Sequence, residues 1–223
     1  MKVAIVKYNA GNIYSVTNAL RRLGVEPMLT DSAEELLTAD RVLFPGQGEA
    51  RQAMDYLRSH SLDRVICDLR QPVLGICIGQ QLMCRHSEEG DTDCLGIFPV
   101  DVKRFRSVRH EDKVPHMGWN QIRWNHYPAL DSRPSRPAQK DARHFENPAP
   151  KGEEQEARKE EPFVYFVHSY YVPICEYTAA TCDYIQPFSA ALHKDNYYAT
   201  QFHPEKSGAA GEKILRGFLE LKR

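Results

Sequence analysis

The chain has 223 residues, a formal net charge of −1, and 42% hydrophobic and 26% charged residues. This length allows one large α/β domain or two small ones, and the near-neutral charge argues against binding to nucleic acid or a membrane surface through a global basic field. No apolar run approaches the roughly 20 residues needed to cross a bilayer, and the N-terminal MKVAIVKYNAGN lacks the features of a signal peptide, so we expect a cytoplasmic protein.

The first half of the chain alternates short apolar runs with amphipathic segments. Strands are predicted at KVAIV (2–6), EPMLTD (26–31), RVLFPG (41–46) and PVLGIC (72–77), with helices over 13–24, 32–40 and 49–60 between them. In the first helix Ile13, Val16, Leu20 and Leu23 recur at helical spacing, and Ser32 is the predicted N-cap of the second. Such alternation predicts a parallel sheet covered by helices on both faces.

The second half of the chain is richer in strands. Consecutive strands are predicted in GIFPVDVKRFR, NQIRWN, FVYFVHSYYV, TCDYIQ and SAALHKDNYYATQFH, followed by a C-terminal helix in GEKILRGFLELKR. We therefore expect an antiparallel or mixed extension of the sheet. One segment, 131–162, is rich in proline and charge and poor in large apolar residues, which predicts a mobile, solvated insertion. A partner-contacting arm is the alternative for this segment.

The six cysteines carry no sign of a structural metal. They form no C-x-x-C pair and no cysteine–histidine cluster with zinc spacing, so we expect reduced thiols, no metal and no cofactor. Cys77 stands apart from the other five, because it lies in Gly75-Ile76-Cys77-Ile78-Gly79, where a buried strand turns into a helix. This is the pattern of a nucleophile elbow, in which the helix N-terminus favours a negatively charged sulfur. A buried core thiol explains the pentapeptide equally well.

A cysteine nucleophile requires a base, and the base requires a group that orients it. His203 and Glu205 follow a predicted strand and are separated by Pro204, so both side chains can point the same way. Glu205 would then hold the His203 ring and select its tautomer. The rival pair is His193 with Asp195.

A glycine-rich turn, Phe44-Pro45-Gly46-Gln47-Gly48-Glu49, ends another predicted strand. The carboxyl ends of parallel strands line one crevice, so this loop could present backbone N–H groups to a substrate oxyanion, together with the N–H of Ile78. The loop lacks the G-K-[ST] of a phosphate-binding loop, and a plain turn stays an alternative.

Taken together and in this order, PGQG, GICIGQQLM and ATQFHPE resemble the class I, or triad-type, glutamine amidotransferases. Within that family, YNAGNIYSVTNALRRLG, PHMGWNQI and YFVHSYYV resemble the glutaminase subunits of imidazole glycerol phosphate synthase. The resemblance spans nearly the whole chain except the charged insertion. It implies a single domain over 1–223 with a flavodoxin-like three-layer fold, a mostly parallel central sheet and an antiparallel extension.

The resemblance also implies roles for individual residues. Cys77 would be the nucleophile, His203 the acid and base, and Glu205 its orienting partner. The oxyanion donors would come from Gly46, Gln47, Gly48 and Ile78, and L-glutamine would be held by Gln81, His168, Ser169 and Tyr170. Glutamine would be hydrolysed through a γ-glutamyl thioester. The ammonia would pass to a TIM-barrel cyclase partner in a heterodimer, which makes imidazole glycerol phosphate and aminoimidazole carboxamide ribotide in histidine biosynthesis.

Two residues depart from the family pattern. Gln47 and Glu49 stand where the family usually carries a small apolar residue and an alanine, and backbone donors survive such changes. Two alternatives stay open from the sequence: a glutaminase that supplies an anthranilate or GMP synthase, and a non-catalytic subunit of the same fold. HMGWN and YNAGN argue against the first, and the intact Cys77, His203 and Glu205 argue against the second.

Overall fold

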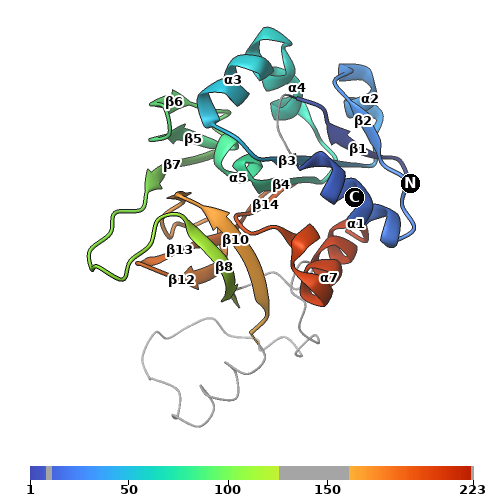
Figure 1. Ribbon diagram of the computed structural model, residues 1–223. Helices are drawn as coiled ribbons and strands as arrows, with labels where there is room; N and C mark the ends of the chain where they lie inside the picture. Colours follow the sequence, from blue (N-terminus) through green and yellow to red (C-terminus); the bar gives the residue numbers. More distant parts are fainter. Residues whose placement is uncertain (9–11, 126–160, 222–223) are drawn as a thin grey trace, which may run out of the picture.

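The fold is built on one central sheet of eight strands (Figure 1), seen in a computed structural model that describes residues 1–8, 12–125 and 161–221. Its strand order is β2-β1-β3-β4-β14-β13-β12-β9. The parallel part contains β2 (Met28–Thr30), β1 (Val3–Val6), β3 (Arg41–Gly46), β4 (Val73–Cys77) and β14 (Tyr197–Thr200). The antiparallel part continues through β13 (Pro187–Lys194), β12 (Thr178–Asp183) and β9 (Arg123–Trp124).

Helices cover both faces of this sheet and create two hydrophobic cores. One core packs α1 (Ile13–Arg22) and α7 (Gly208–Leu219) against the sheet; the other packs α2 (Ala33–Thr38), α3 (Ala50–Ser59), α4 (Leu62–Asp68) and α5 (Ile78–Leu82). The side chains of β1 pack alternately into the two cores, Val3 and Ile5 into the first and Ala4 and Val6 into the second. A strand buried on both faces must be apolar throughout, which explains the continuous VAIV run. The predicted three-layer α/β fold is confirmed.

The predicted helices of the first half are present, because their apolar spacing faces the core. Val16 and Leu20 are buried on α1, and the Ser32 hydroxyl caps α2 by accepting a hydrogen bond of 3.4 Å from the Glu35 N–H. Sequence periodicity did not identify α4, nor the short strands β5 (Cys84–Ser87) and β6 (Thr92–Asp93). Each of these is only two to seven residues long, too short to display a clear period.

The strands of the second half are distributed over three sheets. Antiparallel β8 (His116–Gln121) and β10 (Phe163–His168) form a separate pair, while β11 (Tyr170–Tyr171), β7 (Phe98–Arg104), β5 and β6 form a four-stranded sheet. The predicted strand NQIRWN is divided between the end of β8 and β9, in different sheets. The segment SAALHKDNYYATQFH folds as the β13–β14 hairpin, with Asp195 at φ 53° in its turn.

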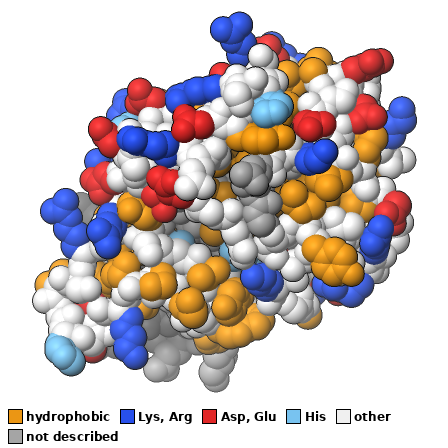
Figure 2. Space-filling view, turned by 45° about the horizontal axis from the view of Figure 1, so that its top comes forward, with side chains coloured by type: hydrophobic (Ala, Val, Ile, Leu, Met, Phe, Trp, Pro, Cys, Tyr) orange, Lys and Arg blue, Asp and Glu red, His pale blue; other side chains and the backbone are white. Residues whose placement is uncertain are grey.

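The predicted insertion at 131–162 lies outside the described residues except for Glu161 and Pro162. Over the described ranges, no helix is long and apolar enough to cross a membrane. In the space-filling view, acidic and basic side chains are interspersed over the upper half of the visible face, and hydrophobic side chains gather in its lower half (Figure 2).

Candidate active site

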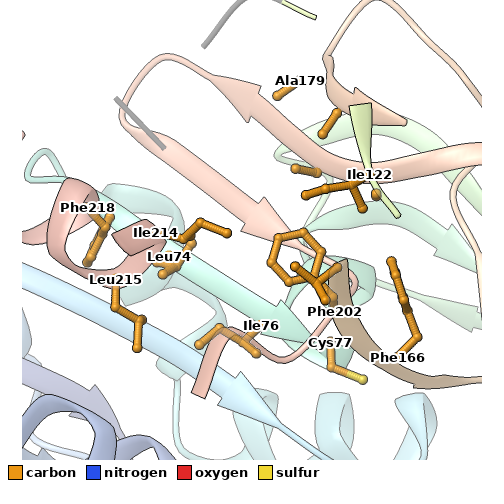
Figure 3. Packing of buried hydrophobic residues seen from close by; sticks show 14 of the residues in the cluster. Leu74, Ile76, Cys77, Ile122, Phe166, Ala179, Phe202, Ile214, Leu215 and Phe218 are labelled. Carbon is orange, nitrogen blue, oxygen red and sulfur yellow. The ribbon is translucent and has the colours of Figure 1, made fainter. Parts of the chain in front are cut away.

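Cys77 is the last residue of β4 and directly precedes α5. Its backbone has φ 56° and ψ −108°, a conformation that non-glycine residues rarely adopt and that costs about 1–3 kcal/mol. The turn brings α5 against β3, since a Cβ added at Gly79 would lie 1.8 Å from the Phe44 carbonyl oxygen. The close-up shows Cys77 at the end of its strand beside Ile76 and Phe202 (Figure 3). The strained strand-to-helix turn is the local geometry of a nucleophile elbow.

The glycine-rich loop begins beside Cys77. Gly46 pairs with Cys77 in the parallel register of β3 and β4, so Gln47 and Gly48 leave the sheet at the same edge. Gly48 has φ +133°, which a glycine tolerates and other residues rarely do. The structure thus brings Gly46, Gln47 and Gly48 to Cys77, and Ile78 follows it directly. Their role as oxyanion donors stays a prediction.

His203 and Glu205 reach the same edge because β14 lies parallel to β4. Thr200 of β14 pairs with Ile76, one residue before Cys77, and the chain continues through Gln201 and Phe202 to His203. Glu205 lies in the short 3₁₀ helix η1 (Pro204–Lys206), and its Oε1 is 2.7 Å from His203 Nδ1. Both side chains are almost completely buried, at 1% and 0% exposed. The expected imidazole–carboxylate pair is therefore present.

The electrostatics of His203 favour its protonated form. Burial alone lowers its pKa, but hydrogen bonding and charge from Cys77 and Glu205 outweigh that effect and raise the pKa to about 10. The buried Nε2 atom makes no hydrogen bond of regular geometry with the described residues, although Cys77 lies near enough to affect this pKa. Loose alignment of this kind is common in catalytic pairs before substrate binds. The surroundings of His203 thus favour its protonated form.

Two positioning residues escaped the sequence analysis. Asn12 donates from Nδ2 to Glu205 Oε1 at 2.5 Å, from an αL conformation at the start of α1. The Ser207 hydroxyl accepts from the Tyr165 N–H at 3.0 Å and donates to the His203 carbonyl at 2.6 Å. The Asn12–Glu205 and Tyr165–Ser207 bonds link residues 193 and 42 positions apart in sequence. A single-sequence pattern contains no signal for such contacts.

The residues predicted to hold glutamine lie together, but two of them are already hydrogen-bonded within the protein. Gln81 donates from Nε2 to the Tyr170 carbonyl at 3.1 Å and to Gln201 Oε1 at 3.0 Å. His168 is buried, with Nδ1 2.7 Å from the Tyr170 carbonyl and Nε2 3.0 Å from His116 Nδ1. A ligand contact by the His168 ring would therefore require one of these bonds to break. Contacts of Gln81, His168, Ser169 and Tyr170 with glutamine stay predictions.

Tyr170 also lines a cavity of about 440 Å³. Glu88, Arg104 and Arg106 lie in the same lining, which combines one carboxylate with two guanidinium groups. Backbone hydrogen bonding from Arg104 is the largest cause that keeps the pKa of Glu88 below its usual range. Cys77 is not among the lining residues; Tyr170 connects the cavity to Gln81, because its carbonyl accepts a hydrogen bond from the Gln81 side chain.

The rival pair does not meet Cys77. His193 Nε2 lies 2.9 Å from the backbone carbonyl of Asp195. His193 pairs with Tyr198, which pairs with Leu74, three residues before Cys77 on β4.

Within the part of the chain that the structure describes, no group of three or more His, Cys, Asp or Glu side chains is arranged to hold a metal ion.

Comparison with known proteins agrees with this geometry. The profile of the family Glutamine amidotransferase class-I matches residues 4–221. The chain belongs to the class I glutamine amidotransferases. It is 58% identical over 221 residues to the imidazole glycerol phosphate synthase subunit HisH of Bacteroides thetaiotaomicron, covering 99% of this chain and 100% of that one. The Escherichia coli K12 protein of the same name is 40% identical over 222 residues, at 99% and 100% coverage.

Within the class I glutamine amidotransferases, the chain thus belongs to the HisH group, and the resemblance drawn from its motifs is confirmed. Solved structures show the same fold at low identity. A glutamine amidotransferase from Thermotoga maritima has a TM-score of 0.61 at 13% identity, covering 99% of this chain and 96% of that one. Another structure described as a glutamine amidotransferase has a TM-score of 0.67 at 16% identity, with 99% and 98% coverage.

Proposed function

We propose that this chain is the glutaminase subunit of an imidazole glycerol phosphate synthase in histidine biosynthesis, with Cys77, His203 and Glu205 as its catalytic residues. The observation that carries the chemistry is the convergence of a strained cysteine at the end of β4 and a buried His203–Glu205 pair after β14. Membership of the HisH group supports the choice of pathway.

In the proposed reaction, the Cys77 thiolate attacks the side-chain amide carbon of glutamine, and the carbonyl oxygen becomes an oxyanion. Backbone N–H groups of the Gly46–Gly48 loop and of Ile78 stabilise that charge. Protonated His203 then gives its proton to the departing nitrogen. The C–N bond breaks, ammonia leaves, and the γ-glutamyl group stays on Cys77 as a thioester. Water attacks the thioester with His203 as base, releasing glutamate and restoring the thiolate and the protonated histidine.

The cavity beside Tyr170 suits the other end of the substrate. The α-ammonium and α-carboxylate of glutamine carry opposite charges, and the cavity offers Glu88 to the first and Arg104 and Arg106 to the second. Its volume of about 440 Å³ lies within the range of small-molecule sites. We therefore place the amino-acid end of glutamine there and its side-chain amide toward Cys77.

The exposed face of the β8–β10 pair is evidence that the chain binds a partner subunit. Its outer face carries Met117, Trp119 and Phe163, which are 62%, 56% and 53% exposed. Trp119 also contacts Tyr165 edge-on at 6.1 Å between ring centroids. This group of exposed apolar side chains is typical of a docking surface. The Tyr165 carbonyl accepts a hydrogen bond of 2.9 Å from the His203 N–H, so a cyclase bound here would contact the strand that holds the base.

The test is to measure glutamate release after mixing the chain with the cyclase and its nucleotide substrate. We expect stimulation by that pair and not by anthranilate or GMP synthase partners, and Cys77→Ser should abolish release. For docking, Trp119→Ala should weaken cyclase binding about tenfold or more, whereas Leu37→Ala on α2, at a similarly exposed position, should not. Stimulation by an unrelated synthase, or activity of the Cys77→Ser variant, would contradict the proposal.

A further inference from the structure

Gln201 contacts Cys77, and the sequence around it carries no pattern that indicates this contact. It directly follows β14, its side chain is completely buried, and its Nε2 lies 3.8 Å from Cys77 Sγ, within hydrogen-bonding range of a sulfur. Its backbone N–H donates to the Ala190 carbonyl at 2.8 Å, which ties Gln201 to β13. This backbone hydrogen bond to the sheet thus holds the Gln201 amide beside the sulfur.

The direction of the Gln201 amide follows from a backbone carbonyl. The Tyr170 carbonyl can only accept, so Gln81 must present its NH₂ group to it. The same NH₂ group faces Gln201, which must therefore present its oxygen to Gln81. The only orientation that satisfies both contacts aims the Gln201 N–H at Cys77 Sγ. If the amide were reversed, two NH₂ groups would face each other and an oxygen would face the sulfur.

A second chain of hydrogen bonds ends at the same Tyr170 carbonyl. His168 must donate to it from Nδ1, which leaves His168 Nε2 as an acceptor for His116 Nδ1–H at 3.0 Å. His116 Nε2 then accepts from Asn120 Nδ2 at 3.4 Å. Burial is the main cause that lowers the pKa of His168 to about 3 and of His116 to about 4, so both rings are neutral, as this sequence of bonds requires. The His116 ring also stacks on the Tyr184 ring, with 3.9 Å between the ring centroids, which further fixes its position.

This second chain begins on β8, whose outer face is the proposed docking surface. Side chains alternate along a strand, so Met117 and Trp119 point outward while His116 and Asn120 point inward. One continuous set of contacts therefore runs from the inner face of β8 through His116, His168 and the Tyr170 carbonyl to Gln81, Gln201 and the sulfur.

We propose that Gln201 is a further residue of glutamine hydrolysis, one that holds the Cys77 sulfur in its attacking orientation, and that the Tyr170 carbonyl, fixed by His168 and His116, sets the direction of its amide. The inference rests on the proposed glutaminase function. A donor amide stabilises the thiolate and restricts its rotation, whereas a misdirected amide opposes the negative charge. His116 and His168 are positioning residues, because they act through Tyr170 and Gln81.

The experiment compares Gln201→Glu and Gln201→Met with wild type in the complex with the cyclase, and uses Gln80→Met as control. Gln80 is equally buried, but its Nε2 donates to the Ser189 carbonyl instead of the sulfur. Two quantities are measured: kcat and KM for glutamate release, and the pH dependence of Cys77 alkylation by iodoacetamide, resolved by peptide mass spectrometry. The second measurement requires no turnover.

For Gln201→Glu we expect kcat to fall about 10- to 100-fold with little change in KM, and the alkylation midpoint to move to higher pH, because a carboxylate replaces the donor. Gln201→Met should lower kcat without the large shift in the alkylation midpoint, and Gln80→Met should change neither kcat nor the midpoint.

His116→Asn, which restores an N–H near the position of Nδ1, should retain more activity than His116→Phe. An unchanged kcat and midpoint in both Gln201 variants of an active complex would overturn the inference. Failure of the wild-type complex to release glutamate would instead refute the proposed function, while the alkylation profiles would still test the amide–sulfur contact.

Discussion

Gly46 and Cys77 are paired across two parallel strands, each at the carboxyl end of its strand. This pairing places the start of the glycine-rich loop beside the proposed nucleophile before any ligand binds. The loop and the nucleophile therefore share one rigid support, the β3–β4 ladder, whose geometry is set by main-chain hydrogen bonds. In the proposed reaction, donors preorganised in this way would stabilise developing charge without a reorganisation cost.

The backbone strain at Cys77 predicts that removing its Cβ raises the free energy of unfolding. At φ 56° a glycine is unstrained, whereas alanine keeps the Cβ and the strain. We expect Cys77→Gly to have a free energy of unfolding about 1 kcal/mol higher than Cys77→Ala, with both variants inactive. Denaturant unfolding of the two variants measures the difference. Equal stability would show that the backbone at Cys77 is relaxed.

Two glycines of the site should respond differently to alanine. Gly79→Ala would place a Cβ 1.8 Å from the Phe44 carbonyl oxygen, a backbone atom that cannot move aside, so we expect loss of the folded elbow and of soluble protein. Gly48→Ala meets no atom within 4 Å but strains a φ of +133°. It should retain the fold and lose activity through the altered loop. Circular dichroism and glutamate release distinguish the two cases; a well-folded, active Gly79→Ala variant would refute this account.

Glu205→Gln tests the charge on His203. The pKa of His203 is raised above its unfolded value of about 6.5 to about 10, so its contribution to stability is complete below pH 6.5 and is lost as the pH rises toward 10. Replacing the Glu205 carboxylate should lower this pKa, flatten the alkaline decline in stability and reduce glutamate release at least about 100-fold. The His203 resonances followed by NMR titration report the pKa directly. A pKa that stays near 10 in the variant would assign the shift to Cys77 alone.

The buried pair His116 and His168 predicts acid sensitivity of the fold. Their pKa values are lowered to about 4 and about 3, whereas both protonate near pH 6.5 in the unfolded chain. The unfolded state therefore binds more protons below pH 6.5, and each site should lower the free energy of unfolding by roughly 1.4 kcal/mol per pH unit as the pH falls toward its folded pKa.

His116→Phe should make that decline shallower between pH 6 and 4, as measured by urea unfolding at several pH values. His110→Gln is the control, because His110 is exposed and its replacement should leave the slope unchanged. If both variants show the wild-type slope, other groups govern the acid sensitivity.

Local pattern predicted the parts of the fold whose burial follows a clear period. The β1 run is apolar because both of its faces are buried, and α1 has its apolar side chains on one face, so each could be located from a few neighbouring residues. The separate sheets of the second half could not be located in this way. His116 and His168 share a register in the β8–β10 pair although they are 52 positions apart, and nothing local in either segment indicates the other.

The sequence by itself determined which residues are proposed to carry the chemistry: a cysteine between two glycines, a histidine two positions from a glutamate, and a glycine-rich loop, in the order of one family. Only the tertiary structure decided how they meet. The last strand in the chain, β14, pairs with β4 and delivers Gln201 and His203 to Cys77 from more than 120 positions away. That pairing depends on main-chain hydrogen bonds and on two cores formed by the whole chain. For this reason the contacts of Gln201, Asn12 and Ser207 appear only after the chain has folded.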